Sequence, residues 1–451
     1  MIVGVQLQSV SDVDFAASLA ELGRLIDTLG FDVTGKVTQK RASLSGSAGL
    51  GEGKLKVLAE HTGGTGVVPS GATKRVQKKD LHKPSAAPID ADDEDDEDDD
   101  DDASADEPPK QMATVVVVDN DLSPSQLRNL ERATGVEVLD RSGVIIEIFH
   151  RHAHTKEAKL QVEIARLQYE APRLREKEHS GDRQRGGGVG GKGDEELELD
   201  KRRIRDRIAE LKKELEDQQA EAQTRRQRRK EAQRAALVGY TNAGKSSLMR
   251  ALTGSDVLIA DKLFATLGTT VRALHPETHP RILVSDTVGF IKNLPHGLVA
   301  SFRSTLDEAH DASLLLFVVD ASDPAFRSQL EVTRTVLKDI GADQIPSMLV
   351  LNKCDRLEEA EKKKLRRAFK GAVLMSALNP DEVRALRDKI VEHFEDSMEE
   401  TTLVVPYGRQ SALGVIRDGA RVLNEDWDNT GAVLKVRAPR DNLDRIRALL
   451  T

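Results

Sequence analysis

One stretch decides the fold of this chain: Gly239-Tyr240-Thr241-Asn242-Ala243-Gly244-Lys245-Ser246, which Ser247 follows. It has the pattern G-x-x-x-x-G-K-[ST], whose backbone N–H groups wrap a phosphate. Lys245 can reach the β- and γ-phosphates, and the Ser246 hydroxyl can ligate Mg²⁺. The apolar run 235–238 precedes the stretch, and a helical pattern follows it, so the helix N-terminus would face the same anion. These residues predict a phosphate-binding loop between a strand and a helix rather than a chance loop.

A second motif, Asp286-Thr287-Val288-Gly289, comes directly after the apolar run 281–285. A run this short is typical of a buried strand, so the motif stands at a strand end. The Asp286 carboxylate suits water-mediated coordination of Mg²⁺, and the Gly289 N–H can sense a γ-phosphate. Loss of that phosphate on hydrolysis would free the segment.

Two further motifs select the base. Asn352-Lys353-Cys354-Asp355 closes the apolar run 347–351, and the Asp355 carboxylate can accept from both N1–H and the exocyclic amine of guanine. Adenine lacks this donor pair and would leave the carboxylate unpaired. Ser376-Ala377-Leu378 follows the run 372–375 and can offer a backbone N–H to the guanine O6. Four motifs in this order, each at the end of an apolar run, predict a GTP-binding domain with GTP and GDP as its ligands.

Composition places the chain among intracellular proteins. Its 451 residues predict about three domains. We expect no membrane span, no signal peptide at Met1, a cytoplasmic location and a monomer. The single cysteine, Cys354, lies within the guanine motif, so no internal disulfide can form, and its interpretation as a small apolar filler is preferred to a redox role.

Negative charge is concentrated in one segment. Asp90 and the run 92–102 carry more negative charge than the formal net charge of -9 of the whole chain. The rest of the chain is therefore close to neutral. Residues 83–110 combine acid, proline and alanine without apolar periodicity, which predicts a disordered insertion. A solubilising loop is the preferred interpretation, and a nucleic-acid mimic or a metal-binding segment are the alternatives.

The residues on both sides of this insertion alternate between strand and helix patterns. Such alternation implies a small parallel sheet covered by helices. The glycine-rich segment 46–51 lacks a Lys-[ST] ending, so we interpret it as a packing loop rather than a second nucleotide site. The expected strands are 2–7, 31–38, 115–118 and 136–140, and the expected helices are 15–29, 53–61 and 124–134.

Residues 155–170 and 198–227 have the spacing of two helices that share an apolar seam, which predicts a short antiparallel hairpin. The segment 183–193 between them is too rich in glycine for a regular element and carries exposed basic side chains. Glycine permits close approach to a phosphate backbone, and arginine and lysine supply the positive charge. This tip is therefore a candidate contact for RNA. Alternatively, the basic side chains form a solvated face whose charge is balanced by glutamate, or the tip packs on the GTP-binding domain. The candidate RNA-contacting residues are Arg183, Arg185, Gly186, Gly187, Gly188 and Lys192.

Taken together, these features resemble the HflX family of ribosome-associated GTPases over nearly the whole chain. The similarity is carried by Gly49-Leu50-Gly51-Glu52-Gly53-Lys54, Asp119-Asn120-Asp121-Leu122-Ser123-Pro124, Val138-Leu139-Asp140-Arg141, Gly186-Gly187-Gly188-Val189-Gly190, Leu199-Asp200-Lys201-Arg202-Arg203-Ile204, the loop 239–246, Phe264-Ala265-Thr266-Leu267 and Asp286-Thr287-Val288-Gly289-Phe290-Ile291. The resemblance implies that Thr266 is the switch I residue that ligates Mg²⁺, and it adds Phe264, Ala265, Leu267 and Gly268 to the nucleotide site.

Two departures from the family pattern stand out. Gly268-Thr269-Thr270 replaces Asp-Pro-Thr, so Thr269 or Thr270 could compete with Thr266 for the metal. The acidic run 92–102 is not a family feature. Phe290 also stands where Ras-like switches carry a water-orienting glutamine, so another element must order the attacking water. By resemblance to GTPases with asparagine at the same position, Asn242 is a candidate ligand for a K⁺ ion beside the phosphates.

The expected fold class is α/β, in four parts: an N-terminal α/β domain (1–150) with the insertion at 83–110, a helical hairpin (151–230), a P-loop GTPase domain (231–398) and a small α+β domain (399–451) ordered strand, helix, strand, helix. The expected catalytic residues are Lys245, Thr266, Gly289 and Asn242. The resemblance implies a GTPase that binds the large ribosomal subunit and its rRNA and splits or recycles stalled or idle ribosomes. A GTPase of ribosome assembly or tRNA modification, and a switch that binds a protein partner, are the alternatives.

Overall fold

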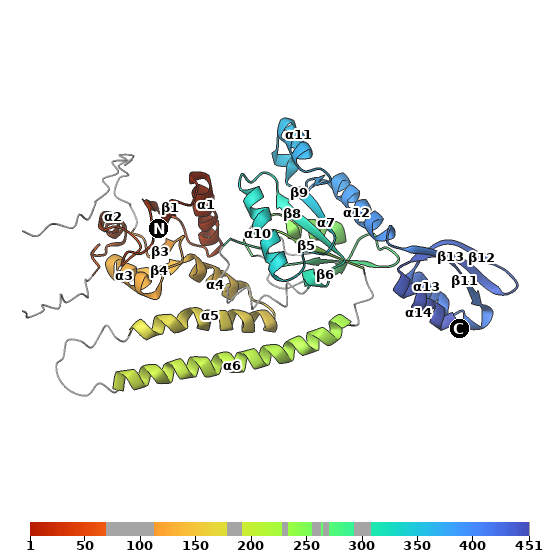
Figure 1. The fold of residues 1–451 in the computed structure, drawn as a ribbon, viewed down its shortest axis with the longest axis horizontal. Helices are drawn as coiled ribbons and strands as arrows, with labels where there is room; N and C mark the ends of the chain where they lie inside the picture. The colour runs from red at the N-terminus through yellow and green to blue at the C-terminus, as the bar shows by residue number, and fades with distance from the viewer. Residues whose placement is uncertain are drawn as a thin grey trace, which may run out of the picture. The chain divides into compact units, whose positions relative to one another are not determined.

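The computed structural model describes residues 1–68, 112–177, 192–227, 233–254, 263–264, 270–292 and 308–450 (Figure 1). The chain separates into two compact units, one formed from residues 1–11 and 33–140 and the other from residues 12–32 and 141–451. The predicted acidic insertion, most of the hairpin tip and most of switch I lie outside the described residues.

The smaller unit is a four-stranded parallel sheet in the order β2-β1-β3-β4. Apolar side chains of β1 and β3 are buried against two helices, one of which, α3, begins with a capping box at Ser123. The elements are β1 (Ile2–Leu7), β2 (Lys36–Arg41), α2 (Glu52–Thr62), β3 (Val115–Val118), α3 (Pro124–Thr134) and β4 (Glu137–Asp140). They differ from the expected pattern in two respects. The helix expected at 15–29 is present but belongs to the larger unit, and β2 is shifted toward the C-terminus relative to the strand expected at 31–38. As an edge strand with one buried side chain, Val37, it has too little apolar periodicity to be located from sequence.

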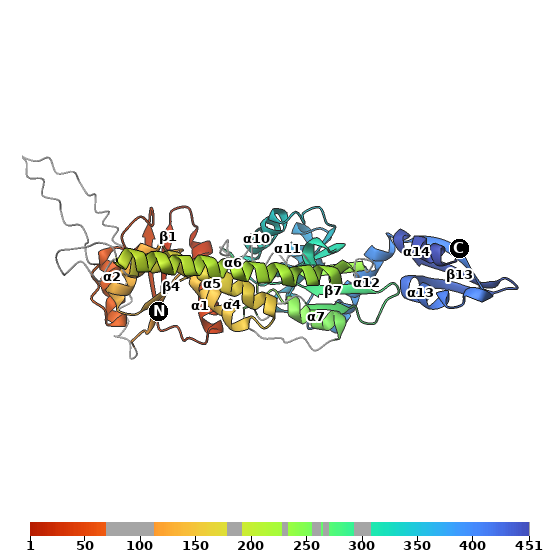
Figure 2. The same cartoon turned by 90° about the horizontal axis from the view of Figure 1, so that it is seen from below.

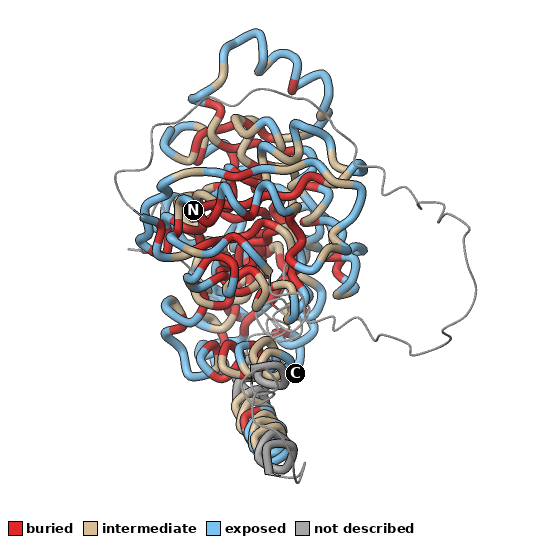
Figure 3. The backbone as a smooth tube through the Cα atoms, turned by 90° about the vertical axis from the view of Figure 1, so that its left-hand side faces the viewer, coloured by how far each residue is buried: buried red, intermediate tan, exposed pale blue. Residues whose placement is uncertain are grey.

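The larger unit is built on a six-stranded sheet in the order β10-β9-β8-β5-β7-β6, parallel except for the antiparallel edge strand β6. All six residues of β5 are buried, and the sheet core packs on α7 and α12. Figure 3 shows the buried backbone in the interior of the molecule. The elements are β5 (Gln233–Val238), α7 (Lys245–Thr253), β6 (Thr270–Ala273), β7 (Ile282–Asp286), β8 (Leu314–Asp320), α10 (Phe326–Asp339), β9 (Ser347–Asn352), η2 (Cys354–Arg356), α11 (Glu359–Ala368), β10 (Val373–Leu374) and α12 (Pro380–Glu395). The α/β fold class is confirmed.

The C-terminal part is a three-stranded antiparallel sheet in the order β11-β13-β12. The expected order of strand, helix, strand, helix is wrong, because two strands rather than one follow the first helix. These two strands, β12 and β13, pair with each other as an antiparallel hairpin. Most of β12 is polar and not buried, so its strand pattern was not visible in the sequence. The elements are β11 (Glu399–Pro406), η3 (Tyr407–Arg409), α13 (Ala412–Gly419), β12 (Arg421–Trp427), β13 (Gly431–Ala438) and α14 (Arg440–Leu450).

The expected helical hairpin is present as α5 (Lys156–Lys177) and α6 (Lys192–Gln227) (Figure 2). Ion pairs join Lys156 to Glu214 and Glu163 to Arg207, so the two helices are antiparallel. Their seam buries Leu160, Ile164 and Leu211, and Leu167, Ile208 and Leu215 pack against it. Helix α6 begins at Lys192, so the expectation that the irregular tip extends to residue 193 is wrong at its C-terminal end. Residues 183–191 lie outside the described part of the chain.

Two further helices belong to the larger unit, α1 (Asp12–Thr28) and α4 (Arg141–His152). Arg141 at the start of α4 is buried and forms an ion pair with the buried Glu21 of α1. In the described part of the chain, no helix is long and apolar enough to cross a membrane.

Candidate active site

The predicted phosphate-binding loop connects β5 to α7 at the carboxyl edge of the parallel strands. Its two glycines are required by their surroundings. A Cβ on Gly239 would lie 2.1 Å from the Val318 carbonyl oxygen, and a Cβ on Gly244 would lie 2.3 Å from the Asn352 amide nitrogen. Gly244 also has φ +91°, a conformation that L side chains rarely adopt. Neighbouring strands therefore enclose the loop so closely that only glycine fits at both ends.

Lys245 is buried inside the loop. Its Nζ donates to the carbonyl oxygens of Gly239 at 3.0 Å and Tyr240 at 2.8 Å. Burial lowers the pKa of Lys245 to about 8, and the nearby Asp286 carboxylate opposes part of this shift. The ammonium therefore lacks full charge compensation within the protein, which suits it to bind an anion.

The second motif meets the start of α7. The Ser246 hydroxyl donates to Asp286 Oδ2 at 3.0 Å, and the Thr287 hydroxyl donates to the Leu237 carbonyl oxygen at 2.7 Å. Within the described ranges, no cluster of three or more His, Cys, Asp or Glu side chains could hold a metal ion. A serine hydroxyl beside a carboxylate nevertheless fits Mg²⁺, which is held by few protein oxygens together with phosphates and water.

Thr241 contributes a polar group that the protein leaves without a bond. Its side chain is 7 % exposed, and its Oγ1 has no hydrogen-bond partner among the described residues. A buried unsatisfied hydroxyl is costly, so a ligand that supplies a partner is favoured. This orphaned group beside Lys245 and Gly289 agrees with a bound phosphate.

Tyr240 was expected to bind the nucleotide, but its side chain forms other contacts. The hydroxyl accepts from the Lys292 backbone N–H at 2.7 Å, and the side chain is 6 % exposed. Burial first, and the charge of Glu21 second, raise the pKa of Tyr240. Only the backbone of Tyr240 remains for the nucleotide.

The guanine motif is connected to the phosphate-binding loop by side chains. Asn352 Nδ2 donates to the Ala243 carbonyl oxygen, and Asn352 Oδ1 accepts from the Ala377 N–H, both at 2.9 Å. Lys353 Nζ donates to the Asn242 carbonyl oxygen and to Asp320 Oδ2, both at 2.7 Å. These contacts join three of the four predicted motifs, the bond between Ser246 and Asp286 joins the remaining one, and Lys353 adds Asp320.

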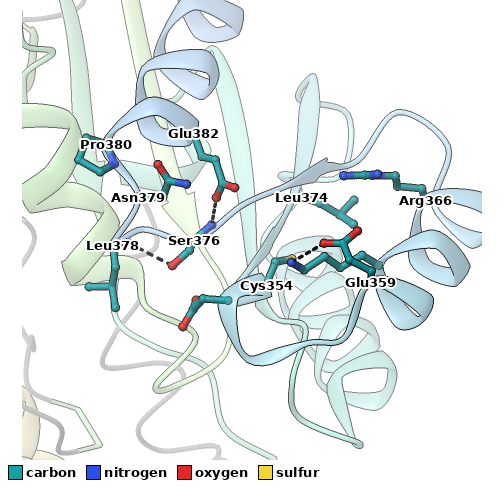
Figure 4. A pocket seen from close by; sticks show the side chains of 11 residues that line it. Cys354, Glu359, Arg366, Leu374, Ser376, Leu378, Asn379, Pro380 and Glu382 are labelled. Atoms are coloured by element: carbon teal, nitrogen blue, oxygen red, sulfur yellow. Dashed lines mark hydrogen bonds and ion pairs between the residues drawn. The ribbon is translucent and has the colours of Figure 1, made fainter.

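Each N–H of the Ser376-Ala377-Leu378 segment has an acceptor within the protein. Ser376 donates to Glu382 at 2.6 Å, and Leu378 donates to the Ser376 hydroxyl at the longer distance of 3.3 Å. Figure 4 shows Ser376 and Glu382 pointing toward each other. A contact from this segment to guanine O6 therefore has to share or replace one of these bonds, and the long Leu378 bond is the weakest.

A cavity of about 550 Å³ opens beside Asp355, Ser376 and Leu378 (Figure 4). Asp355 and Leu378 are exposed at this cavity, as a base-recognition site requires. Cys354 also lines it, and burial raises the pKa of the Cys354 thiol. This shift disfavours the reactive thiolate and agrees with the filler interpretation.

The segment expected to form switch I is described only in part. Phe264 has φ +59°, is 4 % exposed, and packs its ring on Phe149 of α4 with 4.5 Å between centroids. Ala265, Thr266, Leu267 and Gly268 lie outside the described residues, as does Thr269. Thr270 begins β6, opposite Asp286 of β7.

Sequence reasoning missed several contacts of this site. Asp320 ends the apolar strand β8 as Asp286 ends β7, a signal that could have identified it. Burial alone would raise the pKa of Asp320, but hydrogen bonds from Lys353 and Ser322 hold it below its ordinary value. Glu382 and Glu21 had no such signal, because their roles depend on tertiary contacts. Arg141 belongs to the motif Val138-Leu139-Asp140-Arg141, but nothing in the sequence indicated its contact with Glu21.

Family models match most of the chain. A model described as "GTP-binding GTPase N-terminal" matches residues 105–150, one described as "GTP-binding GTPase Middle Region" matches residues 152–229, and one described as "50S ribosome-binding GTPase" matches residues 234–353.

Curated relatives extend the similarity to the full length. "GTPase HflX" of Gluconacetobacter diazotrophicus is 58% identical, and the match covers 100% of this chain and 97% of that protein. "GTPase HflX" of Caldanaerobacter subterraneus is 34% identical over 97% of this chain and 91% of that protein. A solved GTP-binding protein of Sulfolobus solfataricus in complex with GDP has a TM-score of 0.41 and 23% identity, with 87% of this chain and 97% of that chain covered. By its full-length similarity to the curated relatives, this chain belongs to the HflX family of GTPases and is a GTP-hydrolysing enzyme.

Proposed function

We propose that this GTPase binds the large ribosomal subunit and its rRNA, and uses the GTP cycle to split or recycle stalled or idle ribosomes. The observation that carries the proposal is the match of residues 234–353 to the model described as "50S ribosome-binding GTPase". The helical hairpin supports it, because the 36 residues of α6 make an arm about 54 Å long at 1.5 Å per residue. An arm of this length can present RNA-binding residues far from the nucleotide.

The charges of the hairpin restrict which of its residues are proposed to contact RNA. Several basic side chains on the described part of α6 are paired with acids: Lys201 with Glu198, Arg203 with Asp200, and Arg207 with Glu163 and Glu210. These pairs favour a solvated, balanced face along the shaft. We therefore assign RNA contact to the tip residues Arg183, Arg185, Gly186, Gly187 and Gly188 together with Lys192.

GTP is proposed to lie along residues 239–247, with its γ-phosphate near Lys245 and the Gly289 N–H. Asp355 would select guanine, and Asn242 would hold a K⁺ ion. Ser246 and Thr266 would hold Mg²⁺, which neutralises charge on the β- and γ-phosphates when it is bound. Burial of Lys245 and the unsatisfied Thr241 hydroxyl support this placement.

The test is cosedimentation of the full chain with ribosomes in the presence of GDP or of a non-hydrolysable GTP analogue. Binding to isolated large subunits that is stronger with the analogue supports the proposal, and light scattering would then follow the dissociation of intact ribosomes. Binding confined to immature subunits would instead indicate ribosome assembly. Absence of ribosome binding in both nucleotide states would leave the protein-binding switch.

A further inference from the structure

The backbone of Lys292, three residues after the second motif, is held at both its N–H and its carbonyl oxygen. The Lys292 N–H donates to the Tyr240 hydroxyl at 2.7 Å, and the Lys292 carbonyl oxygen accepts from Arg141 Nε at 3.4 Å. Tyr240 belongs to the phosphate-binding loop and Arg141 to α4. Lys292 comes three residues after Gly289, so these two bonds restrain the segment that contains Gly289.

Glu21 of α1 interacts with both Arg141 and Tyr240. Arg141 donates from its Nη2 to Glu21 Oε2, and also from Nη1 to the Ser18 hydroxyl at 3.3 Å. The Glu21 carboxylate is 6 % exposed, and its charge acts on the Tyr240 phenol. Glu21 Oε1 has no hydrogen-bond partner among the described residues. The Tyr240 hydroxyl accepts from Lys292, so its own proton remains available to this buried acceptor.

The same segment lies directly against the phosphate-binding loop. The Phe290 N–H donates to the Gly239 carbonyl oxygen at 3.1 Å, and the Thr241 N–H donates to the Phe290 carbonyl oxygen at 2.8 Å. A Cβ on Gly289 would lie 2.9 Å from Thr241 Cα and 3.0 Å from Lys245 Nζ. Gly289 is therefore packed closely against Thr241 and Lys245, and the residue that follows it is hydrogen-bonded to the phosphate-binding loop.

We propose that Glu21, Arg141 and Tyr240 are positioning residues for GTP hydrolysis, which clamp the backbone of Lys292 at its N–H and its carbonyl oxygen and so fix the Gly289 N–H where the γ-phosphate binds. The inference rests on the proposed placement of GTP at residues 239–247. Because only GTP has a γ-phosphate, the clamp affects GTP and its hydrolysis and leaves GDP binding unchanged. A restraint of this kind lowers the entropy lost when the segment becomes ordered around the reacting phosphate.

Tyr240→Phe in the full chain removes the hydroxyl and keeps the ring. We expect single-turnover GTP hydrolysis to fall about 3- to 10-fold, and affinity for a non-hydrolysable GTP analogue to fall by a similar factor, as for the loss of one hydrogen bond. Affinity for GDP stays within about 2-fold of the native value, since no GDP contact is lost. Glu21→Gln acts in the same direction and gives a second route if Tyr240→Phe lowers the yield of folded protein.

The double variant Tyr240→Phe with Glu21→Gln should hydrolyse GTP no more slowly than the slower of the two single variants, because both changes disable the same clamp. The matched control is Tyr407→Phe, which removes a hydroxyl that donates to the Asp428 carbonyl oxygen in the C-terminal part and should leave hydrolysis unchanged. Equal losses of GDP and analogue binding, faster hydrolysis, or additive effects of the two changes would each overturn the clamp. Lys245→Ala separates the two ideas: native-like nucleotide binding in that variant refutes the proposed GTP placement and the clamp with it.

Discussion

Asn352 connects two loops through one carboxamide: its Nδ2 donates to the Ala243 carbonyl oxygen at 2.9 Å, while its Oδ1 accepts from the Ala377 N–H at the same distance. The phosphate-binding loop and the Ser376-Ala377-Leu378 segment are therefore held at a fixed separation by a residue that need not touch the nucleotide. Asn352 is 1 % exposed, so neither bond can be replaced by water without local opening.

Asn352→Ala should weaken binding of GTP and GDP alike by about 10-fold or more, because two buried hydrogen bonds are lost and the loops separate. Fluorescence titration with both nucleotides measures the effect. Asn442→Ala is the matched control, since it removes a comparable bond to the Gly419 carbonyl oxygen in the C-terminal part. Native nucleotide affinity in Asn352→Ala would refute the connecting role.

Asp355→Asn should shift preference from GTP to XTP. The native carboxylate accepts from both guanine donors, whereas an amide presents a donor where xanthine has an oxygen. Competition of each nucleoside triphosphate against labelled GDP measures the preference. Unchanged GTP affinity in the variant, or comparable ATP binding by the native protein, contradicts the guanine assignment.

Nucleotide affinity should depend on pH through Lys245. Its pKa without nucleotide is about 8, below the ordinary value, and bound phosphate favours the ammonium and raises that pKa. The Lys245 contribution to affinity is therefore fully present well below about pH 8 and is lost progressively as the pH rises above this value, because the free amine is then deprotonated and binding must take up a proton. Calorimetry of GDP binding in two buffers of different ionisation enthalpy detects that proton. Lys245→Arg, which stays charged over this range, should lose affinity but also lose the pH dependence.

GTP turnover should be faster in K⁺ than in Na⁺ if Asn242 holds a potassium ion. Asn242 is exposed and has φ +59°, so its side chain is free of the core while its backbone needs a left-handed conformation. Asn242→Gly removes the side chain without backbone strain, and Asn242→Ala removes it with strain. Both should abolish the difference between the two salts. Equal native rates in K⁺ and Na⁺ would leave the ribosome as the proposed activator.

Substitution of Arg183, Arg185 and Lys192 together by Ala should weaken ribosome binding and leave GTP affinity intact. Each lost phosphate contact should lower the slope of log affinity against log salt by roughly 0.7 to 0.9. Cosedimentation at several salt concentrations measures this slope. A triple substitution in the shaft, at Arg202, Arg203 and Arg205, is the control, because these side chains are already paired with acids. Altered GTP affinity with unchanged ribosome binding would favour a tip that packs on the GTP-binding domain.

The motifs could be predicted because each stands directly after an apolar strand, so local sequence determined its place at the sheet edge. Asp286 and Asn352 are examples, since both end buried parallel strands. Edge strands such as β2 and β12 could not be located as well, because their side chains are mostly exposed and their polarity resembles that of loops. The roles of Glu21 and Arg141 were not visible either, because 120 residues separate two side chains that meet only in the folded chain.

The assignment of α1 to the larger unit has a topological consequence. The chain passes from one unit to the other after residues 11, 32 and 140, so β1 precedes α1 in sequence but belongs to a different unit. A single proteolytic cut at any of these crossings leaves the two units covalently joined through the other two. Neither unit is therefore a contiguous segment that can be excised whole, and a shortened chain that begins after residue 140 lacks a helix of the larger unit as well as the whole of the smaller one.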